Sequence, residues 1–155
     1  MQSQKSFEQS QGGSLYLVPT PIGNLEDMTF RGVRLLKEVD LIASEDTRTT
    51  QKLLNHYEIK TPQISFHEHN TQERIHQLIE KLETGMMIAQ VSDAGMPSIS
   101  DPGHELVVAC IQAGIPVIPL PGANAGLTAL IASGISPQPF YFFRFLKRKK
   151  KDQLF

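Results

Sequence analysis

Short apolar segments alternate with amphipathic segments along most of the chain. The apolar segments predict buried strands at residues 15–18, 41–43, 63–66, 86–91 and 116–120. The segments between them have apolar residues at helical spacing or are rich in small residues, and they predict helices beginning near Thr29, Thr47, Asn70 and Asp101 and within 121–125. Regular alternation of strands and helices is typical of α/β proteins. We therefore expect a five-stranded, mainly parallel sheet with helices on both faces.

Capping residues indicate where two of these helices begin. Asn70, followed by Glu73 three residues later, is predicted to form a capping box at the start of the third helix. Asp101 is predicted to cap the fourth helix, with Pro102 at its first helical position. Gly85 predicts the end of the third helix, because glycine readily adopts the left-handed conformation that follows a helix.

The composition indicates one folded domain and excludes several classes of protein. The 155 residues are 40% hydrophobic and 20% charged, which excludes bulk disorder and suffices for one buried core. No apolar run approaches the ~18 residues needed to cross a bilayer, so no membrane association is expected. The polar start, MQSQKSFEQSQGGS, lacks the apolar core of a secretory signal. A single cysteine, Cys110, excludes an intrachain disulfide, and a cytoplasmic location is expected.

Positive charge is concentrated at the C-terminal end of a chain whose net charge is only −1. The basic residues beyond position 143 are Arg144, Lys147, Arg148, Lys149, Lys150 and Lys151. Such a run is typical of a solvated tail, but it can also contact nucleic-acid phosphates. The aromatic segment FYFFRF (140–145) fits either a last strand or a surface that stacks on bases.

Four loops that follow predicted strands are unusually rich in Gly, Pro, Asp and Ser, at 19–24, 44–48, 92–103 and 121–125. Because the carboxyl ends of parallel strands lie at one edge of the sheet, we expect these loops to form a ligand cleft there. The chain has neither a GxxxxGK(S/T) motif nor a GxGxxG between a strand and a helix, which disfavours ATP and nicotinamide cofactors. Small residues at 92–95 and 121–123 would let a flat ligand such as adenosine lie against the backbone. The alternative is that these segments only form tight turns.

The four loops also carry a family resemblance. The segments LVPTPIGNLEDMT (17–29), SEDTRTT (44–50), VSDAGMPSISDPG (91–103) and PLPGANA (119–125) resemble the tetrapyrrole methylase superfamily. Within it they most resemble the ribosomal RNA small subunit methyltransferase I group, which methylates a cytidine 2′-hydroxyl. The resemblance covers about residues 14–151. It implies S-adenosylmethionine (S-adenosyl-L-methionine) as cofactor, small-subunit ribosomal RNA or the small ribosomal subunit as partner, and a homodimer.

The resemblance also implies which residues contact the cofactor. The family binds S-adenosylmethionine in a folded shape between two α/β domains, mainly through backbone and packing contacts. On matching positions these contacts are expected at Ile22, Asp93, Ala94, Gly95, Met96, Ile99, Asn124 and Ala125. The chain would then comprise a disordered tail (1–13), a cofactor-binding α/β domain (14–138), and a last strand with a basic interdomain linker (139–155).

Methyl transfer to a ribose hydroxyl calls for a base, because a hydroxyl is a weak nucleophile; a positioned base contributes ~10²–10⁴-fold. The candidates at or near strand ends are Glu45, Asp46, His67 and Asp93. Asp46 is the first choice, because 44–48 is the most group-specific motif, although Asp46 equally fits a helix cap. Arg48 is expected either to contact a phosphate or to form an ion pair with Glu45.

The segment His67-Glu68-His69 also fits a metal site, since residues 67 and 69 share a face of an extended chain. Two ligands without a third nearby are weak evidence for zinc. We therefore expect no metal, and interpret the segment as an exposed or substrate-facing loop.

The sequence departs from the family's pattern at single positions and in length. Met96 stands where the family usually has Thr, and Ser98 and Arg144 stand where it usually has Gly. The family's second domain does not follow, so the chain is expected to be an N-terminal half. Three functions stay open: an RNA ribose methyltransferase, a tetrapyrrole or other small-molecule methyltransferase, and a non-catalytic fragment that at most binds RNA weakly.

Overall fold

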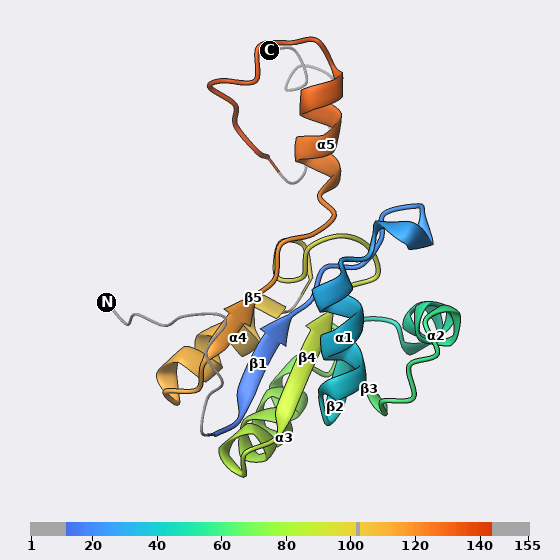
Figure 1. Ribbon diagram of the computed structural model, residues 1–155. Helices are drawn as coiled ribbons and strands as arrows, with labels where there is room; N and C mark the ends of the chain where they lie inside the picture. The colour runs from blue at the N-terminus through green and yellow to red at the C-terminus, as the bar shows by residue number, and fades with distance from the viewer. Residues whose placement is uncertain (1–11, 102, 144–155) are drawn as a thin grey trace. The chain divides into compact units, whose positions relative to one another are not determined.

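The computed structural model describes residues 12–101 and 103–143, so most of the expected tail, Pro102 and the basic run after residue 143 lie outside the described residues. The chain divides into two compact units, residues 1–124 and 125–155, and the division falls within the predicted domain 14–138. In chain order (Figure 1), the first unit contains β1 (Ser14–Leu17), the 3-10 helix η1 (Leu25–Asp27), α1 (Phe30–Glu38), β2 (Leu41–Ser44), α2 (Thr47–His56), β3 (Gln63–Ser65), α3 (Thr71–Glu83), β4 (Met87–Val91), α4 (Gly103–Gln112) and β5 (Val117–Pro119). The second unit contains α5 (Ala125–Ala132).

The five strands form one parallel sheet in the order β3-β2-β4-β1-β5, which confirms the predicted fold class. The central strand β4 pairs with β1 and β2 in registers that place Leu15 and Leu41 opposite Ile88. Every residue of β4 from Ile88 to Val91 is buried. This continuous burial is the property of a parallel strand covered on both faces.

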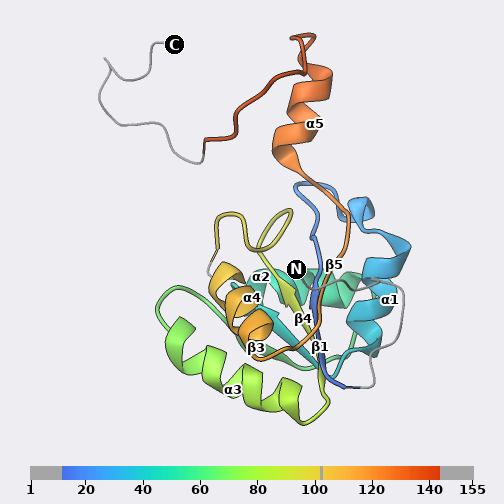
Figure 2. The same cartoon turned by 90° about the vertical axis from the view of Figure 1, so that its left-hand side faces the viewer.

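Helices cover both faces of the sheet, as the sequence predicts. On one face α1 and α2 pack through Leu36 and Leu54, and on the other α3 and α4 pack through Leu78, Leu106 and Cys110. These side chains are at most 1% exposed. Figure 2 shows the sheet between α1 on one side and α3 with α4 on the other. Because both faces are closed by apolar contacts, ligands are left with the edges of the sheet.

The helix caps agree with the sequence in one case and differ in another. Asp101 caps α4 as predicted, since its Oδ1 accepts a hydrogen bond from the backbone N–H of Gly103 at 2.8 Å. The predicted capping box at Asn70 is wrong, because the Asn70 side chain makes no cap bond. Its Oδ1 accepts from the His67 backbone N–H at 2.9 Å, and its amide donates to the Ser65 carbonyl at 3.2 Å. Asn70 therefore closes the loop between β3 and α3 instead of capping α3.

The last strand expected from residue 139 does not form within the described residues, where 139–143 join no sheet. A strand needs a neighbour to satisfy its backbone hydrogen bonds, and the five strands of the first unit pair only with one another. The rest of the predicted segment, 144–155, lies outside the described residues. No helix within the described parts of the chain is long and apolar enough to cross a membrane.

The strand order makes the connections that follow the neighbouring strands β1 and β4 run in opposite directions. The chain leaves β1 through α1 toward β2, and it leaves the neighbouring β4 through α4 toward β5, on the other side of β1. The loops after β1 and β4 therefore diverge. In open α/β sheets, ligands bind in the crevice that such a divergence opens at the carboxyl ends of the strands. The fold therefore predicts a ligand site between the loops at 18–29 and 92–101.

Candidate functional site

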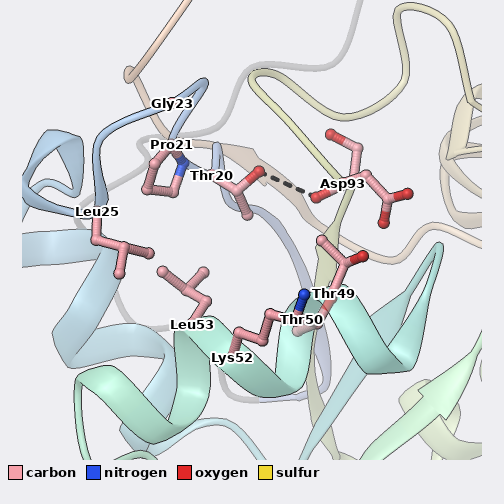
Figure 3. Close-up of a pocket in the computed structure, with 10 residues that line it drawn as sticks. Thr20, Pro21, Gly23, Leu25, Thr49, Thr50, Lys52, Leu53 and Asp93 are labelled. Carbon is pink, nitrogen blue, oxygen red and sulfur yellow. Dashed lines mark hydrogen bonds between the residues drawn. The ribbon is translucent and has the colours of Figure 1, made fainter.

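The loops after β1 and β4 are joined directly by hydrogen bonds. The Thr20 backbone N–H donates to the Gly95 carbonyl at 2.9 Å, and the Gly95 N–H donates back to the Thr20 carbonyl at 3.0 Å. The Thr20 hydroxyl, in a residue only 4% exposed, donates to the Ser92 carbonyl at 3.0 Å (Figure 3). The loop after β5 approaches them at Gly95, and the loop after β2 joins them through Asp93, so all four loops singled out in the sequence come together.

Gly95 is the point at which the loops after β1, β4 and β5 meet. Its φ of +78° lies in the left-handed region that favours glycine. A Cβ placed there would lie 3.3 Å from the Ile22 Cγ2 and 3.5 Å from the Ala123 carbonyl oxygen. We call this meeting point of Ile22, Gly95 and Ala123 the cradle. Gly95 itself is buried and both its N–H and its carbonyl are bonded to Thr20, whereas Ala94 and Gly122 beside it are exposed.

Two further contacts hold the loop after β5 in place. A Cβ at Gly122 would lie 2.6 Å from the Cβ of Pro19, so the backbone passes close over this buried proline ring. The Asn124 amide donates to the sulfur of Met96 at 3.6 Å. The structure therefore brings Asn124 and Met96 together, as the predicted cofactor contacts require.

The other predicted cofactor residues make fewer contacts with the neighbouring loops. The Ala94 carbonyl accepts a hydrogen bond from the Ser92 hydroxyl at 3.4 Å, and the Ile99 side chain is 55% exposed. Ala125 begins the second compact unit, so its position beside the cradle stays a prediction. Ser98 adopts a φ of +71°, a conformation that fits the glycine usual in the family at this position.

A reciprocal clasp joins the loop after β2 to the loop after β4. The Asp93 backbone N–H donates to the Glu45 carboxylate at 3.1 Å, and the Asp46 backbone N–H donates to the Asp93 carboxylate at 3.1 Å. Burial raises the pKa of Glu45, the Asp93 N–H opposes this shift, and the carboxylates of Asp93, Asp101 and Glu68 add to it. Two of the predicted catalytic residues, Glu45 and Asp93, are thus side by side.

Asp46 acts as a helix cap in this structure. Its Oδ1 accepts from the Arg48 backbone N–H at 2.8 Å, which caps α2. The Arg48 guanidinium binds the same carboxylate at 2.8 and 3.1 Å, so the expected ion pair of Arg48 with Glu45 is wrong. The hydrogen bond from the Arg48 side chain is the largest cause that lowers the pKa of Asp46 to about 2. A carboxylate held this way is a weak base.

The remaining catalytic candidate, His67, lies in the loop between β3 and α3. Its Nδ1 is buried and has no hydrogen-bond partner among the described residues, and its Nε2 is 3.4 Å from the Asn70 amide. The rings of His67 and His69 are 5.9 Å apart between centroids. Among the described residues no three His, Cys, Asp or Glu side chains are grouped so that they could hold a metal ion.

Sequence reasoning missed a pocket beside the clasp. It has a volume of about 210 Å³ and opens between the loop after β1, the first turns of α2 and the start of the loop after β4 (Figure 3). The residues that line it are Thr20, Pro21, Gly23, Leu25, Thr49, Thr50, Lys52, Leu53, Ser92 and Asp93. The available signal was helical spacing, because Thr49, Lys52 and Leu53 share one face of the helix that follows 44–48.

The loop motifs and this geometry can now be compared with known proteins. The sequence profile of the Tetrapyrrole (Corrin/Porphyrin) Methylases matches residues 14–152. The chain belongs to this family. The ribosomal RNA small subunit methyltransferase I of Streptococcus pyogenes serotype M6 is 64% identical over 99% of this chain and 54% of its own length. The Bacillus subtilis (strain 168) protein of that name is 60% identical over 99% of this chain and 53% of its own length.

Solved structures of methyltransferases share the fold. Uroporphyrin-III-C-methyltransferase from Thermus thermophilus matches with a TM-score of 0.61 and 25% identity, over 82% of this chain and 55% of that chain. Its complex with S-adenosylhomocysteine matches with a TM-score of 0.58 and 24% identity, over 88% and 57%. The resemblance inferred from the four loops is confirmed. The chain spans about half the length of the curated relatives it matches, corresponding to their N-terminal portion.

Proposed function

We propose that the protein is an S-adenosylmethionine-dependent methyltransferase that modifies the ribose 2′-hydroxyl of a cytidine in small-subunit ribosomal RNA. The observation that carries this proposal is the cradle at Gly95, beside the clasped carboxylates of Glu45 and Asp93. The names of relatives 60–64% identical support RNA as the substrate. The same fold binds S-adenosylhomocysteine in the Thermus enzyme, which supports the cofactor at the level of the fold.

The cradle has the properties that an adenosyl cofactor needs. At Gly95 the loops approach so closely that a side chain would meet Ile22 and the Ala123 carbonyl, and the exposed small residues beside it, Ala94 and Gly122, would let a flat ligand approach the backbone. The cofactor would be held by Ile22, Gly95, Met96 and Asn124. Further contacts with it are proposed at Asp93, Ala94, Ile99 and Ala125. When bound, the cofactor supplies an electrophilic methyl on a sulfonium, so that a C–O bond to the ribose forms as the C–S bond breaks and leaves a neutral thioether.

We assign the role of general base to Glu45 in place of Asp46. The proton of the 2′-hydroxyl would pass to the Glu45 carboxylate as the ribose oxygen attacks. Burial keeps the pKa of Glu45 raised, which makes it the stronger base, whereas Asp46 is neutralised by Arg48. The N–H of Asp93 fixes one oxygen of Glu45 and leaves the other available.

The other expectations extend this proposal to the partners. Arg48 is 88% exposed even while it binds Asp46, so it stays available to a phosphate at the edge of the site. His67 is proposed to face the substrate from the loop after β3. We further propose that the protein acts in the cytoplasm, as a homodimer, on the small ribosomal subunit or its RNA.

Methyl transfer from labelled S-adenosylmethionine to isolated small-subunit RNA tests the proposed substrate. The expected result is label that is recovered as 2′-O-methylcytidine after nuclease digestion, with none on a porphyrinoid acceptor offered in parallel. Label on the porphyrinoid alone would contradict the proposed RNA substrate and favour a small-molecule methyltransferase. Salt-sensitive RNA binding without any cofactor binding would instead indicate a non-catalytic fragment.

A further inference from the structure

The predicted cofactor contacts leave the pocket beside the clasp almost unused. Of the residues that line it, only Asp93 is among the predicted cofactor contacts. Thr20 lines the pocket while its hydrogen-bonded partner Gly95 lies in the cradle, so the two sites are adjacent. A molecule in this pocket would therefore lie next to the cofactor and would not displace it.

The size of the pocket restricts its occupant. Its volume of about 210 Å³ is below the roughly 300 Å³ at which pockets begin to hold drug-sized ligands. A whole adenosyl cofactor is a ligand of that larger class. One sugar ring with an attached phosphate is small enough for the space. The size thus favours a single nucleotide unit of a longer chain, the rest of which would lie outside.

The polar groups of the pocket are divided between cationic and anionic ends. Lys52 comes from α2 and forms no hydrogen bond or ion pair within residues 12–101 and 103–143. The hydroxyl of Thr49 comes from the same face of α2, and the carboxylate of Asp93 lies on the opposite wall (Figure 3). An ammonium with a neighbouring hydroxyl suits a phosphate, and a carboxylate suits sugar hydroxyls.

The apolar wall of the pocket is formed by α2 and the loop after β1. Leu53 is 5% exposed and faces Leu25 and Pro21 of the loop after β1 (Figure 3). The Tyr57 hydroxyl, at the end of α2, donates a hydrogen bond to the Leu25 carbonyl and ties this loop to the helix. The wall presents carbon atoms on which the face of a sugar ring could pack.

We infer that this pocket binds the ribose and phosphate of the RNA nucleotide that accepts the methyl group, with Lys52 contacting the phosphate and Asp93 the sugar end. The inference rests on the proposed function and adds to it the location of the acceptor nucleotide. It makes Lys52, which lines the pocket, the phosphate contact inside it, and leaves Arg48, which does not line the pocket, to a phosphate at the edge of the site. It also places the 2′-hydroxyl at the Glu45–Asp93 clasp.

The experiment compares Lys52→Ala with the control Lys60→Ala. The control removes an exposed lysine that precedes β3, at the amino ends of the strands, whereas the pocket lies at their carboxyl ends. Binding of a short cytidine-containing RNA is measured at several salt concentrations, and binding of S-adenosylhomocysteine is measured by calorimetry. Lys52→Ala is expected to weaken RNA binding and to reduce the slope of log K against log salt by about 0.7, the value for one phosphate of a single strand. Lys60→Ala is expected to leave that slope unchanged, and both variants to bind S-adenosylhomocysteine normally.

Two outcomes would overturn the inference while leaving the proposed function intact. In the first, Lys52→Ala binds RNA with the same affinity and salt slope as Lys60→Ala. In the second, Lys52→Ala loses affinity for S-adenosylhomocysteine as well, which would assign the pocket to the cofactor. Failure of the unmutated protein to bind S-adenosylhomocysteine at all would instead overturn the proposed function and this inference with it.

Discussion

Replacing Glu45 with glutamine is expected to lower kcat for methyl transfer by ~10²–10⁴-fold, the contribution of a positioned general base. Glutamine retains an oxygen that accepts the Asp93 backbone N–H, which Glu45 now accepts at 3.1 Å. The clasp should therefore persist, and S-adenosylhomocysteine should bind with unchanged affinity. The measurement is kcat and KM with saturating cofactor, beside a calorimetric Kd for S-adenosylhomocysteine.

The pH profile distinguishes loss of a base from loss of structure. Only the ionised form of Glu45 accepts a proton, so log kcat should rise with pH as the group ionises and level off above its raised pKa. That rising limb should be absent in Glu45→Gln. The matched control is Glu80→Gln, an exposed position on α3, which should keep both the rate and the profile. A Glu45→Gln variant with an unchanged kcat and profile would exclude Glu45 as the base.

Replacing Gly122 with alanine is expected to weaken S-adenosylhomocysteine binding strongly. The added Cβ would lie 2.6 Å from the Cβ and 2.8 Å from the Cγ of Pro19, a rigid ring buried under this loop. Insertion of a methyl group into closed packing costs about 1–3 kcal/mol, or roughly 5–150-fold in affinity when the bound state bears the strain. We expect the variant to relieve this contact by separating the loops after β1 and β5, which would weaken a site that needs both loops together.

Gly12→Ala is the control for Gly122→Ala. Nothing lies within 4 Å of a Cβ at Gly12, so this substitution adds the same methyl group without a contact. Calorimetric Kd values for both variants, with thermal unfolding to show that each is folded, make the comparison. Equal affinity of the two variants would mean that the approach of Gly122 to Pro19 does not shape the cofactor site.

The fold follows from the sequence because the pattern of buried strands is strong. The run from Ile88 to Val91 is apolar except for Gln90, and such a run is typical of a parallel strand covered on both faces. The sequence was a poorer guide where one side chain can make two alternative sets of hydrogen bonds. Asn70 fits a capping box in sequence, yet its side chain closes the loop to His67 and Ser65. The choice depends on contacts that are not encoded in residue spacing.

The cradle was predictable for a similar reason, and the roles around it were not. Glycine and proline at strand ends identify the loops that meet at Gly95, because these residues permit close backbone approach. Asp46 and Glu45 are adjacent acids in one motif, and sequence alone does not show which of them Arg48 neutralises. The pocket at Lys52 needs the packing of α2 against the loop after β1, which brings together residues distant in sequence.

Calorimetric titration of the folded chain with S-adenosylhomocysteine tests most directly whether the cradle is a cofactor site. The predicted result is saturable binding with one site per chain, weakened in Gly122→Ala and unchanged in Gly12→Ala and Glu45→Gln. The Streptococcus pyogenes relative, which is about twice as long, serves as the positive control. Absence of binding by the folded chain, under conditions in which that relative binds, would contradict the claim that the cradle is a cofactor site.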